Sequence, residues 1–139
     1  MRRFYYDSSI AKFILGLSSC HTITLGPFVF SKRKEYDIPQ NIRNHETCHS
    51  VQWIEIACLV GLLIFALQLS INITEWWYLT TTLAFYLWYG IEYIVRLCLY
   101  LDANKAYKMV SFEQEAYTSE HDVNYIENRH MFTGWLKFL

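Results

Sequence analysis

Two long stretches of the chain contain almost no charged side chains. Residues 56–74 carry none, and residues 76–101 carry only Glu92 and Arg96. A run of about 19 apolar residues is long enough for a helix to cross the hydrocarbon core of a bilayer. The pattern therefore predicts a transmembrane helical hairpin. A soluble bundle with long buried helices is the alternative.

The polar segment 70–75 separates the two stretches and predicts the turn between them. Trp76 and Trp77 follow it, where an aromatic belt would meet the membrane surface. Glu92 and Arg96 are spaced i, i+4 and should pair inside the protein, because an exposed charge in the bilayer is costly.

The first 38 residues follow a different pattern. Residues 8–17 predict a short amphipathic helix, residues 21–25 alternate, and residues 28–30 return after Gly26-Pro27, which is typical of a β-hairpin. Pro39 fits the first position of the first long helix.

The fold class is therefore mainly α, with a small N-terminal β-hairpin. Ser111-Phe112-Glu113-Gln114 matches an S-x-x-Q capping box and predicts a last helix from Phe112 to about Arg129. We expect a single domain over 1–139, divided into an N-terminal helix and hairpin, a first long helix with the first span, a second span and a last helix, at 1–38, 39–70, 76–110 and 112–130.

Composition supports contact with lipid. The chain is 53% hydrophobic and 18% aromatic, above a typical soluble domain, and its net charge of −1 gives no indication of a nucleic-acid partner. The turn carries only Glu75, whereas basic residues flank the two stretches. By the positive-inside rule both termini should be cytoplasmic. These basic residues are Arg2, Arg3, Lys12, Lys32, Arg33, Lys34 and Arg43 before the first stretch, and Lys105, Lys108, Arg129 and Lys137 after the second.

The first long helix also carries the clearest chemical motif, His45-Glu46-Thr47-Cys48-His49, which reads H-E-x-x-H. Four residues apart on a helix, His45 and His49 share one face and can hold one cation. Glu46 lies about 100° round the helix, beside the position of a metal-bound water. This spacing favours a hydrolytic zinc site, which also needs a third protein ligand. Glu113 and Glu115 are candidates on the same side of the hairpin.

The chain resembles the gluzincin-type zinc metallopeptidases, in which a Glu from a later helix completes H-E-x-x-H. Among these it is most similar to the small integral-membrane endopeptidases of the prenyl-protein-processing and stress-response types, whose later segment is close to E-x-x-A-D. Glu113-Gln114-Glu115-Ala116-Tyr117 matches the Glu and the Ala but has Tyr117 in place of Asp. The resemblance implies that His45, His49 and Glu113 hold Zn²⁺ and that Glu46 is the general base. It also implies that strand 22–25 holds substrate.

Several further residues are candidates for smaller roles. Tyr117, His121, Tyr125 and Arg129 follow Glu113 and offer donors for an oxyanion. Glu55 is expected to be a structural partner of a base, and His21 a structural histidine. Gln52 is a candidate for substrate contact or support of the site, and Cys48 for packing.

Two other functions remain open. Glu127-Asn128-Arg129-His130 is a second E-x-x-H, so a di-iron carboxylate site with Glu92 and Glu113 is one alternative. A non-enzymatic membrane protein with a structural metal site is the other. The preferred hypothesis is a zinc metallopeptidase that is integral to the membrane, with its site on the cytoplasmic side. Its expected partners are a membrane-associated polypeptide substrate and the bilayer, and selectivity is expected from an oligomer or a partner protein.

Overall fold

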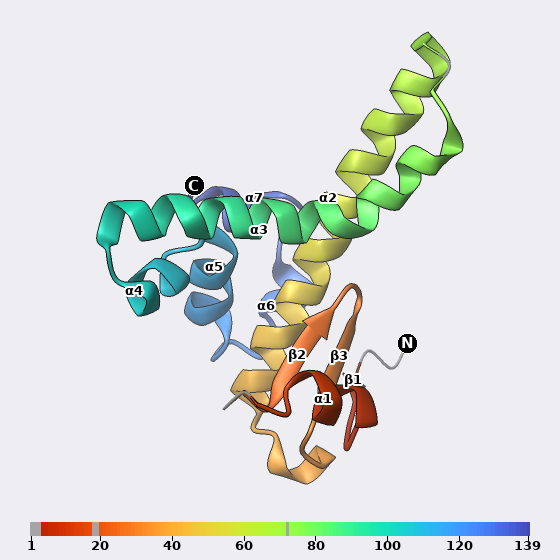
Figure 1. The fold of residues 1–139 in the computed structure, drawn as a ribbon. Helices are drawn as coiled ribbons and strands as arrows, with labels where there is room; N and C mark the ends of the chain where they lie inside the picture. The colour runs from red at the N-terminus through yellow and green to blue at the C-terminus, as the bar shows by residue number, and fades with distance from the viewer. Residues whose placement is uncertain (1–3, 18–19, 72) are drawn as a thin grey trace. The chain divides into compact units, whose positions relative to one another are not determined.

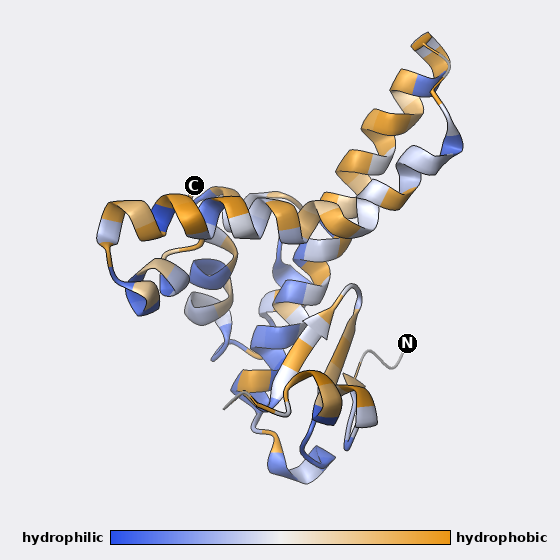
Figure 2. Ribbon diagram, in the orientation of Figure 1, coloured by the Kyte–Doolittle hydropathy of each residue, from blue (hydrophilic) through white to orange (hydrophobic). Residues whose placement is uncertain are grey.

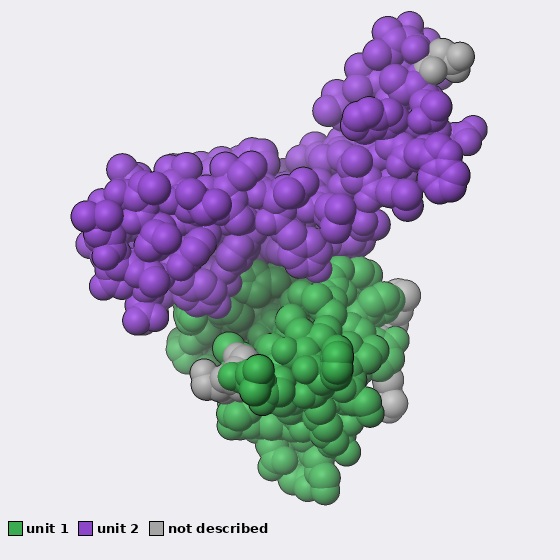
Figure 3. Space-filling model, in the orientation of Figure 1, with its two compact units in different colours: residues 1–51, 115–130 green, residues 52–114, 131–139 purple. Residues whose placement is uncertain are grey.

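The computed structural model describes residues 4–17, 20–71 and 73–139, which are mainly helical and include a small three-stranded sheet (Figure 1). This confirms the predicted helical class. The described chain forms two compact units, residues 1–51 with 115–130 and residues 52–114 with 131–139 (Figure 3). Arg2, Arg3 and Asn72, on which the predicted orientation and turn partly depend, lie outside the described residues.

The first unit contains the sheet, in the order β1-β3-β2, so β2 is an edge strand. Strands β2 and β3 pair antiparallel with Thr24 opposite Val29, and Gly26 adopts a φ of 61° in the turn between them. The predicted hairpin is therefore confirmed, and β1 adds a parallel strand that was not predicted. The elements before the first long helix are β1 (Phe4–Tyr5), α1 (Ser9–Ile14), β2 (Thr22–Leu25), β3 (Phe28–Ser31) and η1 (Glu35–Asp37).

Helix α2 (Gln40–Ile71) agrees with the predicted range 39–70 to within one residue at each end. The Pro39 carbonyl accepts a hydrogen bond from the Arg43 amide at 3.3 Å, which places Pro39 at the helix boundary. Figure 2 shows a largely polar first half of α2, which carries the H-E-x-x-H pentad, and an apolar second half.

The second unit continues with η2 (Glu75–Tyr78), α3 (Leu79–Tyr100), α4 (Ala103–Lys108) and the start of α5 (Ser111–Ser119), and it ends with α7 (Thr133–Leu136). The predicted second span, 76–110, is therefore too long. Helix α3 ends at Tyr100 because Leu101 is left-handed, with a φ of 52°. Asp102 then caps α4 by accepting a hydrogen bond from the Lys105 amide at 3.0 Å.

The core of the second unit is aromatic. Phe112 lies with its ring centroid 4.7 Å from that of Phe85 on α3 and 5.0 Å from that of Trp135 on α7. Ile56 on α2 and Val110 are buried in the same cluster. Because Phe112 precedes Glu113 in α5, this packing fixes the start of the helix that carries Glu113.

Two helical segments, Gln40–Ile71 and Glu75–Tyr100, are long and apolar enough to cross a membrane. In the most apolar 18-residue stretch of each segment only 17% and 11%, respectively, is buried, whereas a core helix of a soluble protein is mostly buried. Tyr78 Oη, at the end of η2, donates to Gln68 Oε1 on α2 at 2.9 Å and thereby links the two segments. Figure 1 shows α3 turning away from α2 after this short antiparallel stretch. A hairpin that crosses the bilayer remains a prediction.

The last helix is shorter than predicted. Helix α5 ends at Ser119, and a separate turn, α6 (Tyr125–Asn128), follows it. The break falls in a segment rich in Ser, Asp and Asn, whose side chains compete with helical hydrogen bonds. Ser119 Oγ donates to the Glu115 carbonyl at 2.7 Å, and Asp122 Oδ1 accepts from the Asn124 amide at 2.9 Å.

The start of α5 is held differently from the predicted capping box. The Ser111 amide donates to Glu92 Oε1 on α3 at 2.8 Å, and Ser111 Oγ donates to Glu92 Oε2 at 2.7 Å. Gln114 Nε2 donates to the Met109 carbonyl at 2.9 Å. The carboxylate that caps α5 therefore comes from α3. The predicted pairing of Glu92 with Arg96 is confirmed at 3.1 Å.

Candidate metal centre

The two histidines of the pentad face one another near the start of α2. His45 Nε2 lies 3.1 Å from His49 Nε2, and the rings are nearly perpendicular, with centroids 4.8 Å apart. Two nitrogens bound to zinc at about 2.0–2.1 Å in tetrahedral geometry are about 3.3 Å apart. The observed separation is therefore close to that required of two ligands of one ion.

Glu113 completes a candidate metal-binding group. His45, His49 and Glu113 each offer one ligand atom, and these atoms lie within 4.8 Å of one another. His49 and Glu113 are buried, and Tyr89 donates to Glu113 Oε1 at 2.9 Å, which orients the carboxylate. Two imidazoles and one carboxylate form a donor set that catalytic zinc sites use. The side chains present therefore fit a zinc ion.

Glu46, the expected general base, is held by the edge strand β2. Thr22 Oγ1 donates to Glu46 Oε1 at 2.6 Å, and Thr24 Oγ1 donates to Glu46 Oε2 at 2.5 Å. Because alternate residues of a strand point to the same face, this Thr-x-Thr spacing delivers two donors to one carboxylate. The alternating pattern of residues 21–25 predicted the strand, but no pattern in the sequence indicated the contact with Glu46.

A carboxylate outside the recognised motifs lies beside His45. His45 Nδ1 is 3.2 Å from Glu120 Oε2, and the two side chains are only 12% and 17% exposed. Donation from Nδ1 to Glu120 leaves the lone pair of His45 on Nε2, the atom that faces His49. Asn44 Nδ2 donates to the Glu120 carbonyl at 2.9 Å and thereby holds the loop after α5. Glu120 belongs to no short sequence motif that would have predicted this contact.

Tyr117 packs against His45, with ring centroids 4.7 Å apart at an interplanar angle of 66°. This is the position at which the resemblance expects an aspartate. The structure places a phenol ring there, and the carboxylate beside His45 is that of Glu120, three residues further on. A carboxylate therefore contacts the first histidine of the motif, although residue 117 is a tyrosine.

Glu115 is engaged in a different network. It is fully buried and accepts hydrogen bonds from Tyr125 Oη at 2.8 Å and from Arg129, whose Nε and Nη2 both donate. Burial and the neighbouring Glu115 carboxylate raise the pKa of Tyr125 well above its usual value, so its hydroxyl remains a donor. Tyr125 and Arg129, two of the expected oxyanion donors, thus both bind Glu115.

The remaining candidates lie in varied surroundings. His121 is exposed, with Nε2 3.4 Å from Glu120 Oε1. Gln52 is buried, and its Nε2 donates to the Phe112 carbonyl at 3.0 Å. Glu55 is also buried, and it accepts from the Phe132 amide at 2.9 Å and from Trp135 Nε1 at 3.2 Å. Glu55 therefore has a structural role, although these two partners are neutral N–H groups.

The second E-x-x-H motif is not part of the metal-binding group. Glu127 and His130 are exposed, and Glu92 caps α5. Within the described ranges, His45, His49 and Glu113 are the one set of three or more potential ligands that comes together. Cys48 is buried beside His49, and His21 is exposed at the start of the hairpin.

Comparison with known proteins adds no family to this description. No family model, no curated protein and no solved structure matches the chain.

Proposed function

We propose that this protein is an integral-membrane zinc metallopeptidase of the gluzincin type. The observation that carries the proposal is the grouping of His45, His49 and Glu113, with Glu46 on the same helix as the two histidines. Zinc is the proposed metal because nitrogen and carboxylate ligands in this combination are typical of hydrolytic zinc sites.

Bound zinc supplies a Lewis acid for the peptide carbonyl and lowers the pKa of water to about 7. Glu46 accepts a proton from the attacking water and delivers it to the leaving amine. Thr22 and Thr24 orient the Glu46 carboxylate, and Glu120 orients His45. Tyr117, which contacts His45, is the best-placed of the four proposed oxyanion donors, because Tyr125 and Arg129 bind Glu115.

The proposed location is the membrane, with the site on the cytoplasmic side. Support comes from the exposed apolar surface of α2 and α3 and from the basic residues that flank them. His49 precedes Ile56, the first residue of the uncharged stretch, by seven residues, or about 10 Å of helix. The metal would therefore lie near the membrane surface, where water and a membrane-associated polypeptide both reach it.

The test uses the protein purified in detergent without chelator. Glu46→Gln should retain zinc, because Glu46 is not a ligand, but should lose at least about 100-fold in cleavage of a pool of synthetic peptides. Glu127→Gln, which changes an exposed glutamate on α6, is the matched control and should retain both properties.

Two results would contradict the proposal. Equal cleavage by the wild type and Glu46→Gln would show that any peptidase activity comes from elsewhere. A fully zinc-loaded wild type that cleaves none of the peptides would favour a structural metal site.

A further inference from the structure

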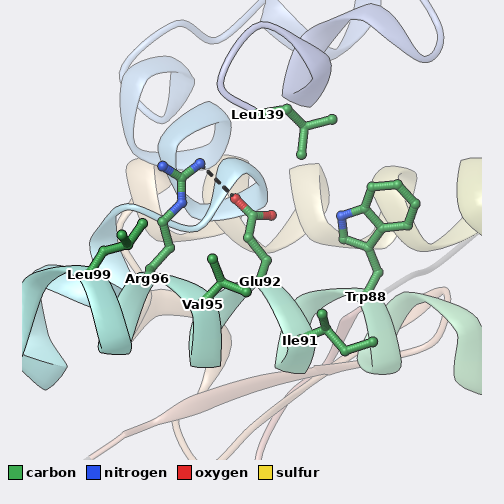
Figure 4. Close-up of a pocket in the computed structure, with 7 residues that line it drawn as sticks. All are labelled: Trp88, Ile91, Glu92, Val95, Arg96, Leu99 and Leu139. Atoms are coloured by element: carbon green, nitrogen blue, oxygen red, sulfur yellow. Dashed lines mark hydrogen bonds and ion pairs between the residues drawn. The ribbon is translucent and has the colours of Figure 1, made fainter.

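A groove of about 500 Å³ lies on α3, within the second unit (Figure 4). Trp88, Ile91, Val95 and Leu99 form its apolar wall, and all four side chains are exposed. The groove also contains the only two charged residues of α3, Glu92 and Arg96. Its volume is within the range of small-molecule sites, which are about 300–1,000 Å³.

The negative charge of Glu92 in this groove is stabilised by the start of α5. Glu92 accepts two hydrogen bonds from Ser111 at the N-terminus of α5, where the helix dipole is positive, and a third from Arg96 Nη2. The Glu92 carboxylate is therefore shared between Arg96 and the N-terminus of α5.

Arg96 retains donor capacity towards the groove. Its Nη2 donates to Glu92 Oε1 at 3.1 Å and to the Phe138 carbonyl at 3.0 Å. Among the described residues, every hydrogen bond of Arg96 is made through Nη2. A guanidinium has five N–H groups, of which Nη2 carries two. The N–H groups of Nε and Nη1 are therefore the donors that Arg96 can offer to a phosphate group.

The position of Arg96 along α3 suits the headgroup of a lipid. Arg96 lies four residues, or about 6 Å, before the end of α3 at Tyr100. An apolar stripe runs along α3 away from this end. It consists of Val95, Ile91 and Trp88, which are four and three residues apart and so lie on one face of the helix. A phosphate at Arg96 thus leaves an acyl chain lying along this stripe.

We propose that the groove binds one anionic phospholipid, with its phosphate on Arg96 and an acyl chain along Val95, Ile91 and Trp88. The inference rests on the proposed membrane location of α3 and is independent of the metal chemistry. Because Glu92 also caps α5, a bound lipid stabilises the start of the helix that carries Glu113.

The test is native mass spectrometry of the full-length protein in detergent, titrated with phosphatidylglycerol or with phosphatidylcholine of the same acyl chains. The expected result is one phosphatidylglycerol per chain, at least about tenfold tighter than phosphatidylcholine because of the charge on Arg96. An excess of inorganic phosphate should not displace the lipid, because phosphate alone lacks the apolar contact.

Three variants make this test specific. Arg96→Gln should weaken phosphatidylglycerol binding about tenfold or more. Since Arg96→Gln also removes the partner of Glu92, Val95→Trp provides a second variant that fills the groove without altering the ion pair and should also weaken binding. Lys105→Gln removes a cation on α4 outside the groove and should bind lipid as the wild type does.

Equal binding of the two lipids, or unchanged binding by Val95→Trp, would overturn the proposal. Dimers without lipid, abolished by Val95→Trp, would also overturn it and assign the groove to a second copy of the chain. The zinc content measured on the same samples reports the metal centre separately, so failure of one proposal is distinguishable from failure of the other.

Discussion

Glu120 illustrates how a single side chain outside the motif can tune a metal ligand. Its carboxylate is within hydrogen-bonding distance of His45 Nδ1 and thereby selects the tautomer with a lone pair on Nε2. We predict that Glu120→Gln lowers zinc affinity about 10–100-fold, the usual effect of removing such a partner. Competition with a chromophoric chelator measures the change.

The control for Glu120→Gln is again Glu127→Gln, which removes an exposed carboxylate near the same loop. Its zinc affinity should equal that of the wild type. Unchanged affinity in Glu120→Gln would show that the contact with His45 does not affect metal binding. Loss of metal in Glu127→Gln would revive the di-iron hypothesis.

At the residue scale the sequence predicted the contacts that depend on spacing within one helix. The i, i+4 spacing of His45 and His49 and that of Glu92 and Arg96 both led to the observed pairs. The contact of Glu120 with His45 joins residues 75 positions apart, so no local pattern indicated it. The threonine donors to Glu46 depend on how a strand packs against a helix, which periodicity does not specify.

Helix α5 carries two glutamates with different surroundings, and this difference yields a prediction at the scale of the element. Glu113 belongs to the candidate metal-binding group, whereas Glu115 binds Tyr125 and Arg129. We predict that Glu113→Gln weakens zinc binding much more than Glu115→Gln does. Elemental analysis after equilibration with limiting zinc measures the difference, and the reverse order would reassign the third ligand.

Glu115→Gln should instead lower stability. Breaking a buried ion pair by removing one partner costs about 3–5 kcal/mol, because the other charge is left buried. Thermal unfolding in detergent should therefore show a clear loss for Glu115→Gln. The double variant Glu115→Gln/Arg129→Met removes both charges and should recover much of that loss. It also supplies a folded protein for the zinc comparison.

The elements themselves were predicted with uneven success, for identifiable reasons. Helix α2 followed from its long apolar run and from Pro39 at its start. The second span was predicted to end too late, because the left-handed Leu101 and the cap at Asp102 carry no strong hydropathy signal. Strand β1 was missed because it has only two residues and depends on pairing with β3.

The whole molecule exposes much apolar surface on α2 and α3, which favours a lipid environment. We predict that the protein stays with the membrane fraction after extraction with alkaline carbonate and is released only by detergent. Such extraction removes proteins held by charge but not those whose apolar helices are inserted in the bilayer. Recovery of the protein in the carbonate supernatant would contradict the proposed membrane location.

At this scale the sequence indicated the class of molecule more readily than its arrangement. Hydropathy identified two apolar helices, and the structure confirms that both are long enough to cross a membrane. It did not indicate that α3 turns away from α2 (Figure 1), because hydropathy does not specify how one helix packs against other elements.

The most direct test of the proposed zinc site is the metal content of the wild type beside His49→Ala, measured by elemental analysis after purification without chelator. His49 is buried and faces His45, so its loss removes one of two nitrogen ligands. We predict about one zinc per chain in the wild type and almost none in the variant. No metal in either protein, or iron near two per chain, would contradict it.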